Sequence, residues 1–191
     1  MSELRISLAR CLACRTMLSS YNNHIMYLDS FNNKIESIAR QPKYQKKVKV
    51  LGCIRGLDTL SAMCLIAEII DINRFSHPKY LTSFAGLDIS EYSSCGKEKC
   101  FSITKQGNRF IRTIVAEATQ YAFRIPNILR KIKDRRKGAD PRLIDIGDRC
   151  MHRLYKKLTK MIFRGKPRNK IKIACAREML GFIWESLKLV S

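Results

Sequence analysis

The sequence predicts a mostly α-helical protein: a coiled-coil arm followed by a helical domain with a helix-hairpin-helix-like turn and a small irregular loop or hairpin. Two observations lead to this fold class. Apolar residues recur with helical spacing through most of the chain, and the stretch that lacks this spacing is small and polar. Of the 191 residues 46% are hydrophobic, which is enough for a buried core. We expect a coiled-coil helix at 1–40, a basic linker at 41–49 and a C-terminal domain at 50–191.

The arm is predicted from residues 15–40, where selected positions alternate by three and four, as do the a and d positions of a coiled coil. These positions hold Leu18, Tyr21, Ile25, Leu28, Asn32, Ile35 and Ala39. Asn32 is the polar residue at an a position, which fixes register and oligomer number at some cost in stability. We therefore expect a homo-oligomer through this helix. The alternative is one helix of an intramolecular bundle, which three heptads do not exclude.

A basic segment separates the arm from the domain. Residues 40–49 carry five basic groups and no acid, and Gln41-Pro42 is expected to end the first helix. The pattern that follows has the form of a helix-hairpin-helix, with Gly56 and Asp58 in its turn. In that motif, backbone N–H groups at a helix start bind a DNA phosphate. Asp58 can cap the second helix but would repel a phosphate, so a plain helix pair remains the alternative.

The rest of the domain reads as helices around one polar stretch. Residues 78–87 suggest a short helix closed by Gly86, and 88–104 lack helical periodicity, which predicts an exposed loop or hairpin. Long helices are expected at 107–123, 140–163 and 168–189. Gly165-Lys166-Pro167 should separate the last two helices.

The charge predicts a polyanionic partner, most simply nucleic acid. Lys and Arg number 37 against 16 Asp and Glu, a net charge of +21, and residues 130–172 alone hold 17 basic and four acidic groups. A block of this kind is expected where a protein follows a phosphate backbone; the alternative is a solvated surface of charged helices. We predict that nucleic acid is bound by Lys97, Lys105, Arg109, Arg112, Arg135, Arg136, Lys156, Lys157, Lys166 and Arg168.

Other classes are disfavoured. No run of about 18 apolar residues is present, and charges interrupt the apolar stretches of the N-terminus, so we expect neither a membrane span nor a secretory signal. The eight Cys should then stay reduced. Cys11 and Cys14 have zinc-ligand spacing, but Cys95 and Cys100 are spaced too widely, so no metal site is expected.

The order of motifs resembles a known family from about residue 15 to the end. The matching stretches are LGCIRGLDTLSAMCLIAEI, RFSHPKYLTSFAGL, EYSSCGK, ITKQGNRFIRTIVAEA and RGKPRNKIKIACAREMLGFIW. They look like the C-terminal region of transposases of the insertion-sequence one-ten/one-sixteen/nine-oh-two family, the bridge-RNA-guided recombinases. The resemblance implies DNA and a structured guide RNA as partners, and a cytoplasmic location at the bacterial nucleoid.

The resemblance also implies a division of chemistry. Members of the family carry an N-terminal RuvC-like domain whose DEDD carboxylates bind magnesium, then a coiled coil and a C-terminal domain with a nucleophilic serine. This sequence starts just before the coiled coil, so we expect it to lack the RuvC-like half and to need that half for activity. Magnesium is implied for that half, and no cofactor is expected in this chain.

Mapped onto this chain, the family serine is Ser94, with Ser93 as the runner-up. Ser94 lies in Tyr92-Ser93-Ser94-Cys95-Gly96-Lys97, where Cys95 replaces the first glycine of the family loop. A serine hydroxyl can attack a phosphodiester and keep its energy in a phosphoserine ester, provided that cations stabilise the phosphoryl oxygens. The nearby candidates are Lys97, Lys105, Arg109 and Arg112. The rival interpretations are a truncated, inactive nucleic-acid-binding module that associates with a full-length transposase, and a structure-specific RNA-binding protein.

Overall fold

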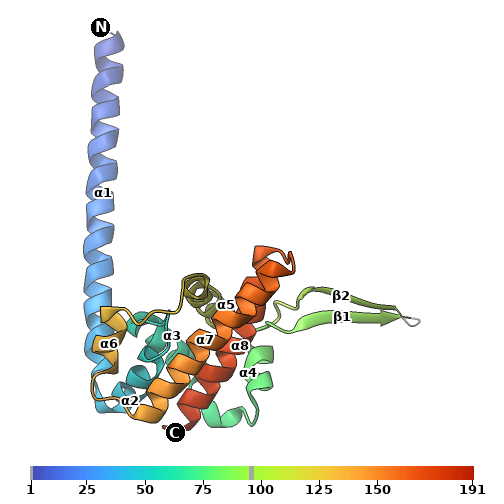
Figure 1. Ribbon diagram of the computed structural model, residues 1–191. Helices are drawn as coiled ribbons and strands as arrows, with labels where there is room; N and C mark the ends of the chain where they lie inside the picture. Colours follow the sequence, from blue (N-terminus) through green and yellow to red (C-terminus); the bar gives the residue numbers. More distant parts are fainter. Residues whose placement is uncertain (1, 95–96) are drawn as a thin grey trace. The chain divides into compact units, whose positions relative to one another are not determined.

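The computed structural model describes residues 2–94 and 97–191, with side chains described for 10–89 and 103–191. The chain divides into two compact units, residues 1–40 and 41–191. Unit 1 is the single helix α1 (Ser2–Ala39). Unit 2 is a set of helices with one two-stranded sheet (Figure 1). The predicted mostly α-helical class is confirmed.

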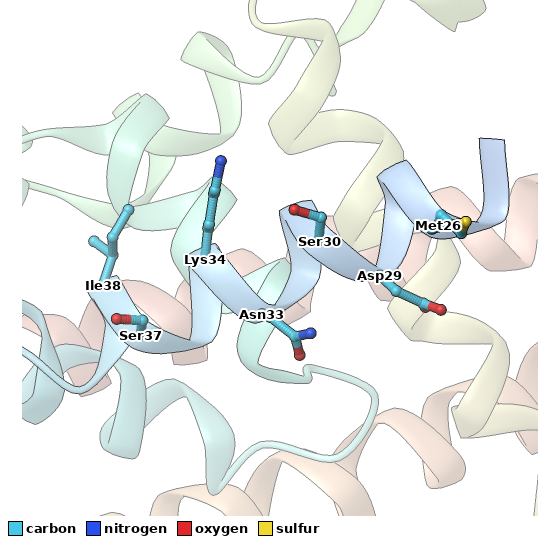
Figure 2. A pocket seen from close by; sticks show the side chains of 7 residues that line it. All are labelled: Met26, Asp29, Ser30, Asn33, Lys34, Ser37 and Ile38. Carbon is cyan, nitrogen blue, oxygen red and sulfur yellow. The ribbon is translucent and has the colours of Figure 1, made fainter. Parts of the chain in front are cut away.

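Helix α1 exposes many apolar side chains. Leu18, Tyr21 and Leu28, which occupy predicted core positions, are 60–63% exposed. Figure 2 shows another stretch of the same helix, where a hollow of about 760 Å³ is lined by Met26, Asp29, Ser30, Asn33, Lys34, Ser37 and Ile38. Because one helix supplies the whole lining, this hollow is an open surface rather than an enclosed ligand cavity. Helix α1 thus carries a series of apolar side chains on its surface, and the predicted coiled coil stays a prediction.

Unit 2 begins with α2 (Pro42–Gly52) and α3 (Thr59–Ile69), which are joined by a tight turn. The 3₁₀ helix η1 (Ile72–Arg74) and helix α4 (Pro78–Phe84) lead to the antiparallel hairpin of β1 (Ile89–Ser94) and β2 (Lys97–Ile103). The remaining elements are helical: α5 (Arg109–Ala118), η2 (Thr119–Phe123), α6 (Arg130–Arg136), α7 (Pro141–Phe163) and α8 (Arg168–Lys188).

The core of unit 2 gathers around α8. Helix α8 packs against α2, α4, α5 and α7. Fully buried members of the core include Leu65, Leu81, Ile111 and Leu180. The indole of Trp184 donates a hydrogen bond to the Phe75 carbonyl at 2.8 Å, which satisfies the polar end of a side chain that packs against the core. No described helix is both long and apolar enough to cross a membrane.

Three features differ from the sequence-based prediction. Most of the predicted linker 41–49 is helical, because Pro42 starts α2 at a position that needs no N–H donor, and Tyr44 and Val48 pack against the core. The predicted helix 107–123 changes to 3₁₀ geometry after Ala118. Helix α6 was not predicted, because the helix is too short to show an apolar periodicity. Ile132 is its buried apolar residue.

Two glycines inside long helices provide a stability test with opposite signs. A Cβ on Gly147 in α7 would lie 2.5 Å from the Cys53 carbonyl oxygen and 2.8 Å from a guanidinium nitrogen of Arg136. A Cβ on Gly181 in α8 would meet nothing within 4 Å. Gly147→Ala should therefore lower the free energy of unfolding by about 1–3 kcal/mol, whereas Gly181→Ala should raise it by roughly 0.5–1 kcal/mol. Urea denaturation of both variants checks this; a shift in the same direction would contradict it.

Candidate nucleic-acid interface and reactive hairpin

The predicted nucleophile lies at the end of the β1–β2 hairpin. Ser94 is the last residue of β1, and its Cα partner across the hairpin is Lys97, the first residue of β2. Ser93 pairs with Glu98. Figure 1 shows the hairpin extending away from the helices of unit 2. Cys95, the residue at the family's glycine position, lies outside the described residues. The backbone thus brings Ser94 and Lys97 together at the far end of the hairpin.

The root of the hairpin is fastened to α4 and α5. Three backbone bonds join the segments on either side of it: Thr104 N–H to Asp88 O (2.9 Å), Lys105 N–H to Gly86 O (3.1 Å) and Asn108 N–H to Phe84 O (2.7 Å). The Arg112 guanidinium on α5 donates to the Ala85 carbonyl at 2.8 Å. These bonds hold the base of both strands on the core.

Close approach at this root requires glycine at two positions. Gly86 has φ +66°, and a Cβ there would lie 2.8 Å from the Gln106 carbonyl oxygen. Gly107 has φ +147°, and its Cβ would collide with the Phe84 carbonyl oxygen. The importance of Gly107 was missed from the sequence. The available signal was its place just before Asn108, which caps α5 by accepting from Ile111 N–H at 3.0 Å.

The predicted cations around Ser94 separate into two groups. Lys105 and Arg109 are exposed at the hairpin root, and Arg112 there is half-buried and bonded to Ala85. At about 3.3 Å per strand residue, the root lies roughly 17 Å from Ser94. Of these predicted cations, Lys97, which is placed by its backbone, shares the far end of the hairpin with Ser94. The root cations therefore lie away from the end of the hairpin that carries Ser94, and their binding of nucleic acid stays a prediction.

The α2–α3 turn is packed into the protein. Gly56 has φ +97°, and a Cβ there would lie 2.5 Å from the Ala118 carbonyl oxygen of α5. The Asp58 carboxylate caps α3 by accepting from Ser61 N–H at 2.8 Å. This carboxylate occupies the place at the helix start where a phosphate would bind. Two helices joined by a tight turn are present. The helix-hairpin-helix motif and phosphate binding by this turn stay predictions, and the Asp58 cap opposes phosphate binding.

Arg135 and Arg136, predicted to bind nucleic acid, instead hold this turn from α6. The Arg136 side chain is buried; its guanidinium donates to Cys53 O at 2.9 and 3.3 Å and pairs with Asp148 at 2.7 Å. Arg135 donates to Leu57 O, and burial lowers the pKa of its guanidinium, although Asp58 acts in the opposite direction. Arg136 is thus corrected from a surface contact to an internal one. Charge counts cannot distinguish an arginine that binds nucleic acid from one that binds the protein's own backbone, because the accepting carbonyls lie far away in sequence.

Helix α7 carries cations that are partly neutralised by α8. Arg149 pairs with Glu185, and both Arg153 and Lys157 pair with Glu178. Burial favours the neutral form of Glu178, but hydrogen bonds from Lys157 and Arg153 outweigh it and hold the pKa of this carboxyl below its ordinary value. Lys157 is therefore engaged within the protein. Lys156 is exposed, and no ion pair joins it to another described residue.

A groove of about 600 Å³ lies between the α2–α3 turn, the end of α5, η2 and the start of α8. Its lining includes Asp58, Tyr121, Arg124 and Arg168. The guanidinium of Arg124 lies over the Tyr121 ring at 5.4 Å, and that of Arg168 over the Phe123 ring at 4.8 Å. Arg168 and Lys166 are both exposed, and their contact with phosphates stays a prediction. Rings and guanidinium planes of this kind can bind bases and phosphates.

The buried thiols do not compete as nucleophiles. Burial raises the pKa of Cys175 to about 11 and that of Cys150 further. Nucleophilic attack needs the thiolate, which is scarce at neutral pH for such groups. Within the described part of the chain, no three His, Cys, Asp or Glu side chains gather as metal ligands.

Comparison with known proteins identifies the segment that carries the turn and the hairpin. The family described as "Transposase IS116/IS110/IS902 family" matches residues 48–133. This segment belongs to the IS116/IS110/IS902 transposase family. The match runs from the end of α2 through the hairpin to α6, so the family segment contains both Ser94 and the bonds at its root. The resemblance inferred from the motifs is confirmed at this level.

Curated relatives support the same family and extend further along the chain. A Sinorhizobium fredii protein named as transposase y4qE is 31% identical to this chain over 138 residues, which cover 72% of this chain and 35% of the relative. The transposase for insertion sequence element IS1533 of Leptospira borgpetersenii is 28% identical over 139 residues, covering 68% of this chain and 38% of the relative. The transposase for insertion sequence element IS1111A of Coxiella burnetii is 26% identical over 97 residues, covering 51% and 26%. The chain thus spans about a third of the length of these relatives.

Proposed function

We propose that this chain is the part of a DNA transposase that binds DNA and supplies a serine nucleophile, Ser94, for cleaving and rejoining strands. The observation that carries the proposal is the hairpin: a family segment presents Ser94 and Lys97 on the paired ends of two strands whose root is bonded to the core. A rigid support that presents an exposed reactive loop is a common arrangement for catalytic residues.

The chemistry balances without an outside energy source. The Ser94 hydroxyl oxygen forms a bond to phosphorus, and the bond from phosphorus to the leaving deoxyribose oxygen breaks. The hydroxyl proton passes to a general base, and the leaving oxygen takes a proton. A hydroxyl of a second strand can then attack the phosphoserine ester and release Ser94, so the phosphodiester energy is conserved.

Charge stabilisation divides along the hairpin. Lys97 is the cation best placed to stabilise the reacting phosphate, because its backbone pairs with Ser94. Lys105 and Arg109 would bind phosphates at some distance and fix the register of the DNA. The described residues offer no cluster of metal ligands, so no step is assigned to magnesium held by this chain. In the family, that metal belongs to the RuvC-like domain.

Helix α1 would join two or more copies of the chain. The oligomer is supported by the exposed apolar series that includes Leu18, Tyr21 and Leu28, together with Asn32 at an a position. A structured guide RNA is a further proposed partner, implied by the family resemblance. Recombination cuts several strands, and an oligomer would bring several serines to one complex.

Replacing Leu28 by Asp should dissociate that oligomer, because a carboxylate at a d position has no partner in an apolar seam. Sedimentation equilibrium should report a multimer for the wild type and a monomer for the variant. Lys34→Asp places the same charge on α1 outside the predicted seam and should leave the mass unchanged. Equal masses for wild type and Leu28→Asp would contradict the proposed seam.

Direct mapping of a protein–DNA adduct tests the proposed function. The chain is incubated with a branched DNA substrate, with and without a separately supplied N-terminal RuvC-like domain of the kind that the family resemblance implies, and is then denatured and digested. Mass spectrometry should find a nucleotide on the peptide that holds Ser93 and Ser94, with fragment ions placing it on Ser94. An adduct on any other residue would refute the assignment.

A second candidate is a binding module that associates with a longer transposase but does not cut DNA. It is favoured by the position of unpaired cations on α7 and on the turn before α8, elements that do not carry Ser94. Under this function the chain binds DNA in the same experiment but forms no adduct, even when the N-terminal part is supplied.

A further inference from the structure

The turn between α7 and α8 displays an aromatic side chain to solvent. We call residues 160–170 the α7–α8 tip. Phe163, the last residue of α7, is 94% exposed, and its neighbour Ile162 is 52% exposed. An exposed phenylalanine forgoes the stabilisation that burial would supply. Its position therefore suits a surface that contacts a partner.

The tip is a defined turn, not a loose loop. The N–H of Gly165 donates to Ile162 O at 2.8 Å, and the N–H of Lys166 donates to Met161 O at 3.1 Å. Together with φ +64° at Gly165, this pair of bonds is a Schellman motif, which closes the helix C-terminus. Pro167 follows directly and starts the turn into α8. Phe163 is thus held at a fixed place on the end of a long helix.

Positive charge without neutralising acid surrounds Phe163. The sequence has no Asp or Glu between Asp148 and Glu178. The α8 carboxylates that pair with α7 are Glu185 and Glu178, and both lie on the C-terminal side of the tip. The tip itself holds the cations Lys160, Arg164, Lys166, Arg168 and Lys170, all exposed. No ion pair neutralises any of them within the described residues.

We propose that the α7–α8 tip is a wedge that places Phe163 against an unstacked base of nucleic acid, while the surrounding cations bind the flanking phosphates. The proposal rests on the proposed function and names its preferred substrate: DNA that is bulged, branched or unwound rather than continuous duplex. Apolar side chains at the ends of basic elements insert between or stack on bases in this way. Arg168, which also lines the groove beside η2, would lead the displaced strand into it.

Charge complementarity favours nucleic acid over a second copy of this chain as the partner of the tip. Five cations on one tip would repel the same tip of a second copy, and an aromatic ring with cations around it matches the faces of bases and the charge of phosphates together. A purely electrostatic surface would need no exposed phenylalanine. Continuous duplex alone would leave the ring in water, since its bases are stacked.

The test measures binding of the full chain by fluorescence anisotropy to two labelled DNAs of equal length, a continuous duplex and the same duplex with a short bulge. Phe163→Ala should weaken binding to the bulged DNA about tenfold and change binding to the continuous duplex less than about twofold. Phe163→Trp keeps an aromatic ring and should retain the wild-type preference for the bulged DNA. Tyr80→Ala, which removes an exposed aromatic on α4, is the matched control and should change neither affinity. A 2-aminopurine in the bulge should be quenched by the wild type and not by Phe163→Ala.

Several results would overturn the wedge. Equal losses on both DNAs, or no loss, would show that Phe163 does not contact an unstacked base. A change in oligomer mass for Phe163→Ala would assign the tip to a second copy, and loss of binding to anionic vesicles in place of DNA would assign it to a membrane. If the wild type binds neither DNA, the proposed function itself fails. If it binds both DNAs without the Phe163-dependent preference, only the wedge fails.

Discussion

In the Ser94→Ala variant, covalent protein–DNA adducts are expected to fall below detection while affinity for DNA stays within about twofold of the wild type. The alanine lacks the oxygen that would bond to phosphorus. Affinity should persist because the exposed cations at the hairpin root and on the α7–α8 tip are unchanged. Denaturing electrophoresis of labelled DNA measures the adduct, and anisotropy measures affinity.

Two companion variants make this result specific to Ser94. Ser93→Ala removes the neighbouring hydroxyl, and it should retain adduct formation, because the Cα partner of Ser93 across the hairpin is Glu98 and not Lys97. Lys97→Met should slow adduct formation by about 10²–10³-fold if its cation stabilises the reacting phosphate. Adducts that persist in Ser94→Ala and disappear in Ser93→Ala would transfer the role to Ser93.

Helix positions were predictable because their signals are local. Apolar spacing and turn residues placed the helices that became α7 and α8 within one or two residues of their observed ends. The segment 41–49 was misread because its lysines dominate its composition, whereas Tyr44 and Val48 decide its packing. The composition of the segment reflects the side chains that face water, whereas two apolar side chains on one face are enough to pack a short helix on the core.

The candidate site was only partly predictable, since sequence proximity is a poor guide to distance around a hairpin. Lys105, Arg109 and Arg112 follow Ser94 closely in the chain, but β2 carries them back to the root, roughly 17 Å away. Arg112 then serves the root itself through the Ala85 carbonyl. The role of each cation depends on partners that no local pattern reveals.

The Arg136→Met variant is expected to lose about 1–3 kcal/mol of the free energy of unfolding, because it removes a buried donor of hydrogen bonds. The Arg136 guanidinium joins α6 to Cys53 O at the end of α2 and to Asp148 in α7. Methionine fills a similar volume but donates no hydrogen bond, so Asp148 and the Cys53 carbonyl each lose a donor. Urea denaturation of the full chain, followed by circular dichroism, measures the change.

An exposed pair at the start of α7 provides the matched control. Arg142 pairs with Asp140 at 3.0 Å, with side chains 77% and 40% exposed, whereas Arg136 is 6% exposed. Arg142→Met should leave stability close to the wild type, because water screens the exposed pair and the Asp140 cap on the Arg142 N–H is retained. Similar losses in the two variants would mean that net charge, not the buried bonds to the turn, determines the effect. A large loss for Arg136→Met alone would show that the most basic part of the sequence uses some of its charge to hold its own fold, leaving the exposed cations for nucleic acid.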